Sequence, residues 1–114
     1  MGMSQEGQLL RIFIDEADKH NGRPLYEEII RFAKEQQMSG ATAIKGFMGF
    51  GHKSHIHTTK LLRLSDNLPI IVEIVDTKDK ISLFLEGLRE IVKDGLITTE
   101  KANVIINRSE NSLS

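Results

Sequence analysis

The chain has 114 residues, of which 39% are hydrophobic and 27% charged, and these values are ordinary for a single globular domain. Its formal net charge is −1, which argues against nucleic acid as a partner, because binding phosphates requires a basic excess or a basic patch. The absence of cysteine fits a reducing compartment, and no apolar run approaches the ~20 residues of a membrane span, so we expect a cytoplasmic protein that is not membrane-embedded.

The first part of the chain predicts a strand followed by a helix. Apolar residues alternate over residues 9–14, where the even-numbered Leu and Ile side chains share one face of a strand. A polar connection leads to Pro24, which suits the first position of a helix because its missing N–H costs nothing there. Gly40 is the left-handed residue expected to stop this helix.

The middle of the chain predicts two strands on either side of a long loop. The second strand is expected over residues 41–48, and residues 57–64 are expected to return as the other arm of a hairpin. A run of β-branched residues predicts a third strand over residues 69–75. The long loop after the second strand therefore holds most of the glycines and histidines of this region.

The last part predicts a second helix and a final strand. Asp76 or Thr77 is expected to cap the helix, Gly95 to end it, and alternation over residues 102–106 marks the strand. This order of elements is typical of a ferredoxin-like α+β domain, with two helices on one face of a four-stranded antiparallel sheet. We expect one such domain with flexible termini, at residues 8–107, 1–7 and 108–114 respectively.

The sheet face opposite the helices is expected to be too apolar to remain exposed. An exposed face of an antiparallel sheet alternates into polar residues. The apolar residues expected on it are Leu9, Phe13, Ala43, Phe47, Ile71, Val75 and Ile105. We predict an oligomer that buries this surface; the alternative is a scatter of exposed apolar residues, which monomers commonly show.

Residues 41–76 hold the clearest candidate site. The glycines there allow the backbone to turn sharply or to approach a ligand closely. They either cradle a phosphate through backbone N–H groups or mark the bent end of a strand. The histidines are potential metal ligands, and the alternatives are solvated loop histidines or a pairing with a phosphate. These residues are Gly46, Gly49, Gly51, His52, His55 and His57.

The chain resembles the PII-like signalling proteins, and more closely a small uncharacterised family within that superfamily. The likeness covers residues 8–107 and includes the order of elements and the long loop after the second strand. Its motifs are Gly40-Ala41-Thr42, Gly46-Phe47-Met48-Gly49-Phe50-Gly51, Ile56-His57-Thr58, Lys60-Leu61-Leu62-Arg63-Leu64-Ser65, Leu68-Pro69, Glu73-Ile74-Val75-Asp76 and Gly95-Leu96-Ile97.

The resemblance implies a homotrimer that binds an adenine nucleotide between neighbouring subunits. It places Lys45-Gly46-Phe47 at the start of the nucleotide-binding loop and Glu73-Ile74-Val75 against the adenine. It makes residues 95–101 a turn near the phosphates, with Lys101 as the phosphate-binding lysine. The other residues that it implies at the ligand are Gly49, Gly51, His52, His55, Gly95, Thr98 and Thr99.

The same turn departs from the family pattern in ways that bear on the ligand. Thr98 and Glu100 stand where the signalling proteins have glycines, and Leu96 stands where they have a lysine. A triphosphate needs several positive donors, so we expect AMP or ADP rather than ATP, and no required cofactor. Ordering of the loop by the nucleotide would then change the surface offered to a regulated partner protein.

Two other functions are open to the sequence. An enzyme is not expected, because the chain shows no nucleophile–base pair and no paired carboxylates. The alternative to nucleotide binding is a metal-binding trimer that resembles the copper-tolerance proteins of the same fold, with His52, His55 and His57 as ligands.

Overall fold

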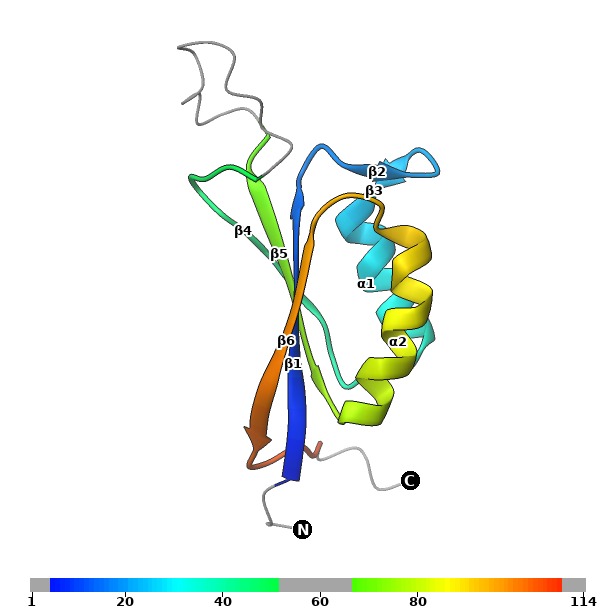
Figure 1. Cartoon of the computed structure of the whole chain (residues 1–114), viewed down its shortest axis with the longest axis vertical. Helices are drawn as coiled ribbons and strands as arrows, with labels where there is room; N and C mark the ends of the chain where they lie inside the picture. Colours follow the sequence, from blue (N-terminus) through cyan, green and yellow to red (C-terminus); the bar gives the residue numbers. More distant parts are fainter. Residues whose placement is uncertain (1–4, 52–66, 110–114) are drawn as a thin grey trace.

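The computed structural model describes residues 5–51 and 67–109, which form an antiparallel sheet with two helices packed on one face (Figure 1). The strands lie in the order β4-β5-β1-β6, and a two-stranded hairpin, β2-β3, precedes the first helix. The predicted ferredoxin-like α+β fold is thereby confirmed. The elements are β1 Gln5–Asp15, β2 Lys19–His20, β3 Arg23–Pro24, α1 Leu25–Glu35, β4 Thr42–Lys45, β5 Pro69–Asp76, α2 Lys78–Ile91 and β6 Leu96–Val104.

The core lies between the two central strands and the helices. Alternate residues of β1 and β5 point toward α1 and α2, as the period of two predicts. Burying each such aliphatic or aromatic side chain contributes about 1.5–3 kcal/mol. The buried apolar residues are Leu10, Ile12, Ile14, Leu25, Ile29, Ala33, Ile70, Val72, Ile74, Ile81, Phe84 and Leu88.

The two helices approach each other closely at a glycine. The rings of Phe32 in α1 and Phe84 in α2 stack with their centroids 4.9 Å apart. A Cβ atom added to Gly87 would lie 2.4 Å from Cζ of Phe32. Gly87 therefore stands in the helix interior, despite its poor helix propensity, because the neighbouring ring occupies the space of a side chain.

Local contacts fix where the helices begin and end. The side chain of Thr77 caps α2 by accepting a hydrogen bond from the N–H of Lys80 at 3.2 Å, as predicted. The first helix ends earlier than expected: Gln37, with φ 58°, takes the left-handed conformation that was assigned to Gly40. Pro24 lies just before α1 rather than at its first position.

β1 and β6 are both longer than the sequence predicted. β1 starts at Gln5, so residues 5–7 belong to the sheet and not to a flexible terminus. β6 pairs with β1 from Leu96 to Val104, so residues 96–101 form a strand and not the predicted turn. The long β1 offers backbone partners along this whole stretch, and Thr98 and Thr99 suit a strand. β4, which was predicted to run over residues 41–48, stops instead at Lys45.

Two further expectations concern the loop and the membrane. The predicted hairpin arm over residues 57–64 lies outside the described residues. Neither described helix is both long and apolar enough to cross a membrane.

Candidate functional site

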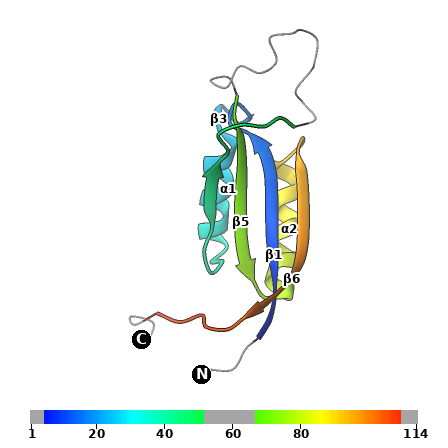
Figure 2. The same cartoon turned by 90° about the vertical axis from the view of Figure 1, so that its left-hand side faces the viewer.

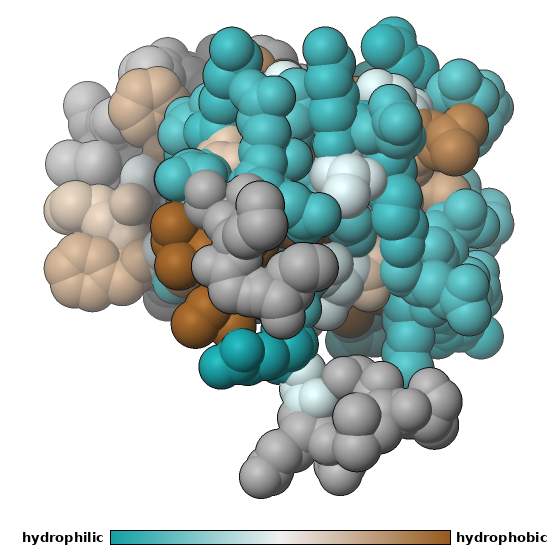
Figure 3. All heavy atoms as spheres, turned by 90° about the horizontal axis from the view of Figure 1, so that it is seen from below, coloured by the Kyte–Doolittle hydropathy of each residue, from teal (hydrophilic) through white to brown (hydrophobic). Residues whose placement is uncertain are grey.

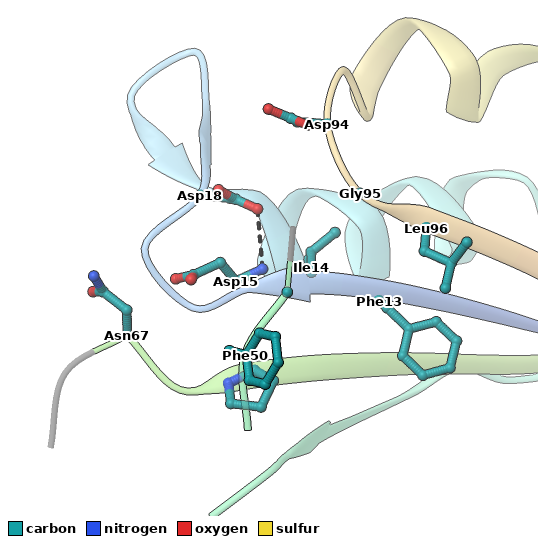
Figure 4. Close-up of a pocket in the computed structure, with 11 residues that line it drawn as sticks. Phe13, Ile14, Asp15, Asp18, Phe50, Asn67, Asp94, Gly95 and Leu96 are labelled. Atoms are coloured by element: carbon teal, nitrogen blue, oxygen red, sulfur yellow. Dashed lines mark hydrogen bonds between the residues drawn. The ribbon is translucent and has the colours of Figure 1, made fainter. Parts of the chain in front are cut away.

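A cavity of about 250 Å³ opens at the end of the sheet where β1 ends and β5 and β6 begin (Figure 4). It lies between the base of the long loop, at Phe50 and Gly51, and the turn before β6, at Asp94 and Gly95. The family resemblance assigned both segments to the ligand, and the structure brings them together. Gly95 has φ 150°, and a Cβ there would lie 2.9 Å from the carbonyl oxygen of Phe13, so this turn requires glycine.

Glu16 contacts both stems of the long loop, the outgoing stem at Lys45 and the returning stem at Leu68. Its carboxylate lies 3.0 Å from Nζ of Lys45, which ends β4, and accepts a hydrogen bond from the N–H of Leu68 at 2.9 Å. The N–H of Glu16 also donates to the carbonyl of Leu68. The hydrogen bond from Leu68, followed by that from Lys45, holds the pKa of Glu16 below its ordinary value.

The glycines at the start of the loop pack against Pro69. The N–H of Gly46 donates to the carbonyl of Pro69 at 2.8 Å, so this amide does not point to a ligand. Cβ atoms added to Gly46 and Gly49 would lie 3.0 and 3.2 Å from Cγ of Pro69, and Gly49 has φ 153°. These two glycines thus fit the bent end of a strand, whereas Gly51 faces open space beside the cavity.

The strand segment assigned to the adenine lies away from this cavity. Glu73 is four residues beyond Pro69, about 13 Å along β5. Ile74 points into the core and is 1% exposed. Glu73 and Val75 instead line a second hollow of about 310 Å³ near the chain termini, together with Ser39 and Asp76. Asp76 is engaged there, because its carboxylate accepts hydrogen bonds from the N–H and hydroxyl of Ser39.

The predicted residues of β6 also lie away from the cavity. Thr98 stands opposite Arg11 and Thr99 opposite Leu10, near the middle of the sheet. Lys101 is five residues beyond Leu96, about 17 Å along the strand, with its ammonium 3.9 Å from the Glu6 carboxylate. Among the described residues of one chain, the predicted site residues therefore form two separate groups.

The open face of the sheet carries an apolar row next to the cavity. Ile44, Ile71, Phe13 and Leu96 are paired across all four strands. The strands themselves lie side by side in the sheet (Figure 2). Ile44 is 44% exposed and Leu96 53%. Seen from the end where the termini lie, hydrophobic side chains gather mainly on the sheet side of a largely hydrophilic surface (Figure 3). The predicted apolar face is thus present in the single chain.

Three residues assigned to that face do not lie on it. Phe47 and Ile105 lie beyond the ends of β4 and β6. Ala43 stands opposite Val72, whose side chain is buried beneath the helices, so Ala43 shares the helix side of the sheet. Its neighbour Ile44 takes the outward position, because a shift of one residue reverses the direction of every side chain on a strand.

An ion-pair cluster lies beside the apolar row. Nε of Arg11 is 3.0 Å from Glu73 and its Nη1 is 3.5 Å from Glu100, on neighbouring strands. The hydrogen bond with Glu73 raises the pKa of Arg11 above its ordinary value. The partner that Glu73 needs in an otherwise apolar strand is therefore Arg11.

The metal hypothesis falls largely outside what the structure describes. His52, His55 and His57 are not among the described residues. Over residues 5–51 and 67–109, no group of three or more His, Asp or Glu side chains is placed to hold a metal ion.

Sequence reasoning missed Glu16 and Asp94. Both lie in polar connections that carry no motif, and only the fold brings Glu16 to the loop stems and Asp94 to the cavity. Phe50 was noted for its family likeness but was not counted as a ligand contact. An aromatic residue between two glycines was the available signal.

Solved structures place the chain in the PII-like class of folds. CPII from Thiomonas intermedia K12, bound to ADP and bicarbonate, matches with a TM-score of 0.66 at 16% identity, covering 93% of this chain and 95% of that one. A further structure of CPII, described as a nitrogen regulatory PII-like protein, contains ADP, AMP and bicarbonate. A putative PII-like signalling protein from Thermus thermophilus matches with a TM-score of 0.63 at 14% identity, covering 90% of this chain and 92% of that one.

The chain belongs to the DUF190 family, described as "Uncharacterized ACR, COG1993", which it matches over residues 7–104. A UPF0166 protein of Aquifex aeolicus (strain VF5) is 40% identical over 98 residues, which are 86% of this chain and 92% of that protein. The predicted membership of an uncharacterised PII-like family is confirmed.

Proposed function

We propose that the protein is a PII-like regulatory module, a cytoplasmic homotrimer that binds AMP or ADP between subunits and signals through the loop after β4. The observation that carries the proposal is the cavity between the base of this loop and the turn before β6. Those segments are the ones that the family resemblance assigns to the nucleotide. CPII, which shares the fold, has been crystallised with ADP and AMP.

The need for more than one subunit follows from where the site residues lie. The loop base and Gly95 are at one end of the sheet, and Glu73, Val75 and Lys101 are toward the other end. A single site that contains both groups requires two copies of the chain. The apolar row Ile44, Ile71, Phe13 and Leu96 gives the copies a surface to bury.

The charges support a mono- or diphosphate over a triphosphate. Lys45, the cation at the loop base, already pairs with Glu16. The described residues that line the cavity include three carboxylates, from Asp15, Asp18 and Asp94, and no Lys or Arg side chain. A triphosphate needs several positive donors, and the described lining residues supply none. The same residues offer no nucleophile with an adjacent base, and we propose a binding role, not a catalytic one.

Calorimetric titration of the purified full chain with AMP, ADP and ATP tests this function. The proposal expects one site per subunit and a dissociation constant for AMP or ADP at least tenfold below that for ATP. No heat with any of the three nucleotides at millimolar concentration would contradict it.

A further inference from the structure

The two outer strands of the sheet have no strand on their outer sides among the described residues. β4 and β6 end the strand order on opposite sides of the sheet (Figure 2). β6 is nine residues long, contains neither proline nor glycine, and has exposed side chains along most of its length. Such an edge presents a row of backbone N–H and C=O groups, which proteins pair or cover because it otherwise attracts other strands.

The backbone of β4 directs two N–H groups outward. The N–H of Gly46, just after this strand, donates to the carbonyl of Pro69 on β5. Hydrogen-bonded pairs alternate along antiparallel strands, so the N–H of Ile44 also faces β5. The N–H groups of Ala43 and Lys45 therefore point to the free edge.

The free edge of β6 follows from the same alternation. The N–H of Glu16 donates to the carbonyl of Leu68, so the even-numbered residues of β1 bond to β5 and the odd-numbered residues bond to β6. Ile97, Thr99 and Lys101 stand opposite even-numbered residues of β1. Their N–H groups therefore point away from β1, to the outer side of the sheet.

The two edges are complementary to each other. Because the sheet has four antiparallel strands, β4 and β6 run in opposite directions, as an antiparallel pair requires. Ala43 and Ile97 both stand opposite buried residues on the helix side, so pairing these strands keeps the helices of both copies on one side. Ile44 and Leu96, the exposed ends of the apolar row, lie at these same two edges.

We infer that β4 of one copy of the chain pairs with β6 of the next copy through backbone hydrogen bonds. The inference rests on the proposed function, which supplies the homotrimer, and refines it by naming the contact between the copies. Two unlike surfaces that join head to tail form a ring where the rotation closes. With the helices outside, such a ring covers the apolar row of each copy in its interior.

Amide hydrogen exchange of the full chain, followed by NMR without nucleotide, tests this contact, because neighbouring residues of one strand serve as controls. Ile44 and Thr98 donate within their own sheet and should exchange slowly in any case. Ala43, Lys45 and Thr99 donate outward, and the edge contact predicts that they exchange at least about a hundredfold more slowly than unprotected amides.

Ala43→Pro tests the contact independently. It removes an outward N–H and leaves the hydrogen bonds between β4 and β5 in place, because proline fits an edge position whose N–H faces outward. Ala43→Ser is the matched control, since it keeps the N–H. In sedimentation equilibrium, the proline variant should shift toward single chains and the serine variant should not. In the proline variant, Thr99 on the other edge should lose its slow exchange while Thr98 keeps it, which also shows that the variant is folded.

The possible results separate the edge contact from the proposed function. A particle of three chains in which the N–H groups of Ala43 and Lys45 exchange at the unprotected rate would overturn the inference and leave the homotrimer standing. An Ala43→Pro variant that remains as tightly assembled as Ala43→Ser would also overturn it. Protected edges in a chain that binds no adenine nucleotide would support the contact and contradict the proposed function. A chain that stays single would contradict both.

Discussion

The carboxylate of Glu16 lies 3.0 Å from the ammonium of Lys45, and this pair joins the segment after β1 to the last residue of β4. The same carboxylate accepts the N–H of Leu68 on the other stem of the loop. A change that weakens the Glu16–Lys45 ion pair therefore affects the position of both stems of the loop. A phosphate that drew Lys45 away from Glu16 would change the base of the loop directly.

The first prediction concerns the contribution of Glu16 to stability at different pH values. Its pKa is lower in the folded chain than its ordinary value of 4.5. The stability that Glu16 contributes is therefore present above about pH 4.5 and is lost as the pH falls through the folded pKa. Glu16→Gln should lower the urea midpoint at pH 7 and flatten the loss of stability between pH 5 and pH 3. Glu86→Gln, an exposed change on α2, is the control and should keep the pH profile of the unmodified chain.

The second prediction concerns the contact between the helices. Gly87→Ala forces a methyl group against the ring of Phe32. Overpacking costs about 1–3 kcal/mol, and the better helix propensity of Ala returns about 1 kcal/mol. We expect a net loss of about 1 kcal/mol in the free energy of unfolding, measured by urea titration. Ser82→Ala, at an exposed position of the same helix, should be neutral or slightly stabilising. A Gly87→Ala variant that is more stable than the unmodified chain would mean that Phe32 moves aside freely.

The third prediction concerns the open face of the sheet. Ile44→Glu places a charge in the apolar row that the homotrimer would bury. Light scattering after size exclusion should show a shift toward single chains. Leu83→Glu is the matched control, because Leu83 is an exposed apolar residue on α2, away from the sheet. Equal molar masses for the two variants would show that this face is not part of the interface between copies of the chain.

The fourth prediction concerns Lys45 and the phosphate. Lys45→Ala removes the cation at the loop base and should weaken AMP and ADP about tenfold, since a charge-assisted hydrogen bond contributes about 1.5–3 kcal/mol. The affinity for adenosine should not change, because adenosine has no phosphate. Calorimetry with the three ligands separates these effects. An equal loss for all three would show that Lys45 supports the fold of the site rather than the phosphate.

The sequence predicted the order of the elements, the helix face of β1 and a cap at Asp76 or Thr77, because alternation and capping are local signals. The sequence prediction failed where pairing with distant residues determines the local structure. Residues 96–101 became a strand because the long β1 was available to pair with them. The face of Ala43 was predicted wrongly, because the alternation in a four-residue strand is too short to indicate its register against β5.

The sequence predicted which segments form the candidate site, but it did not predict the acidic residues that line it. Glycine clusters and family likeness pointed to the loop base and the turn at Gly95. The acidic character of the cavity depends on Asp15, Asp18 and Asp94, from two segments that lie far apart in the sequence and meet only in the fold. The fold, and not a local motif, likewise brings Glu16 into contact with both stems of the loop.

Sedimentation equilibrium of the unmodified chain, over micromolar to near-millimolar concentrations, measures directly whether the chains form the proposed homotrimer. We expect a species of three times the chain mass of 12.9 kDa, with or without ADP. A chain that remains single at the highest concentration would contradict it, because a nucleotide site between subunits would then have no second wall.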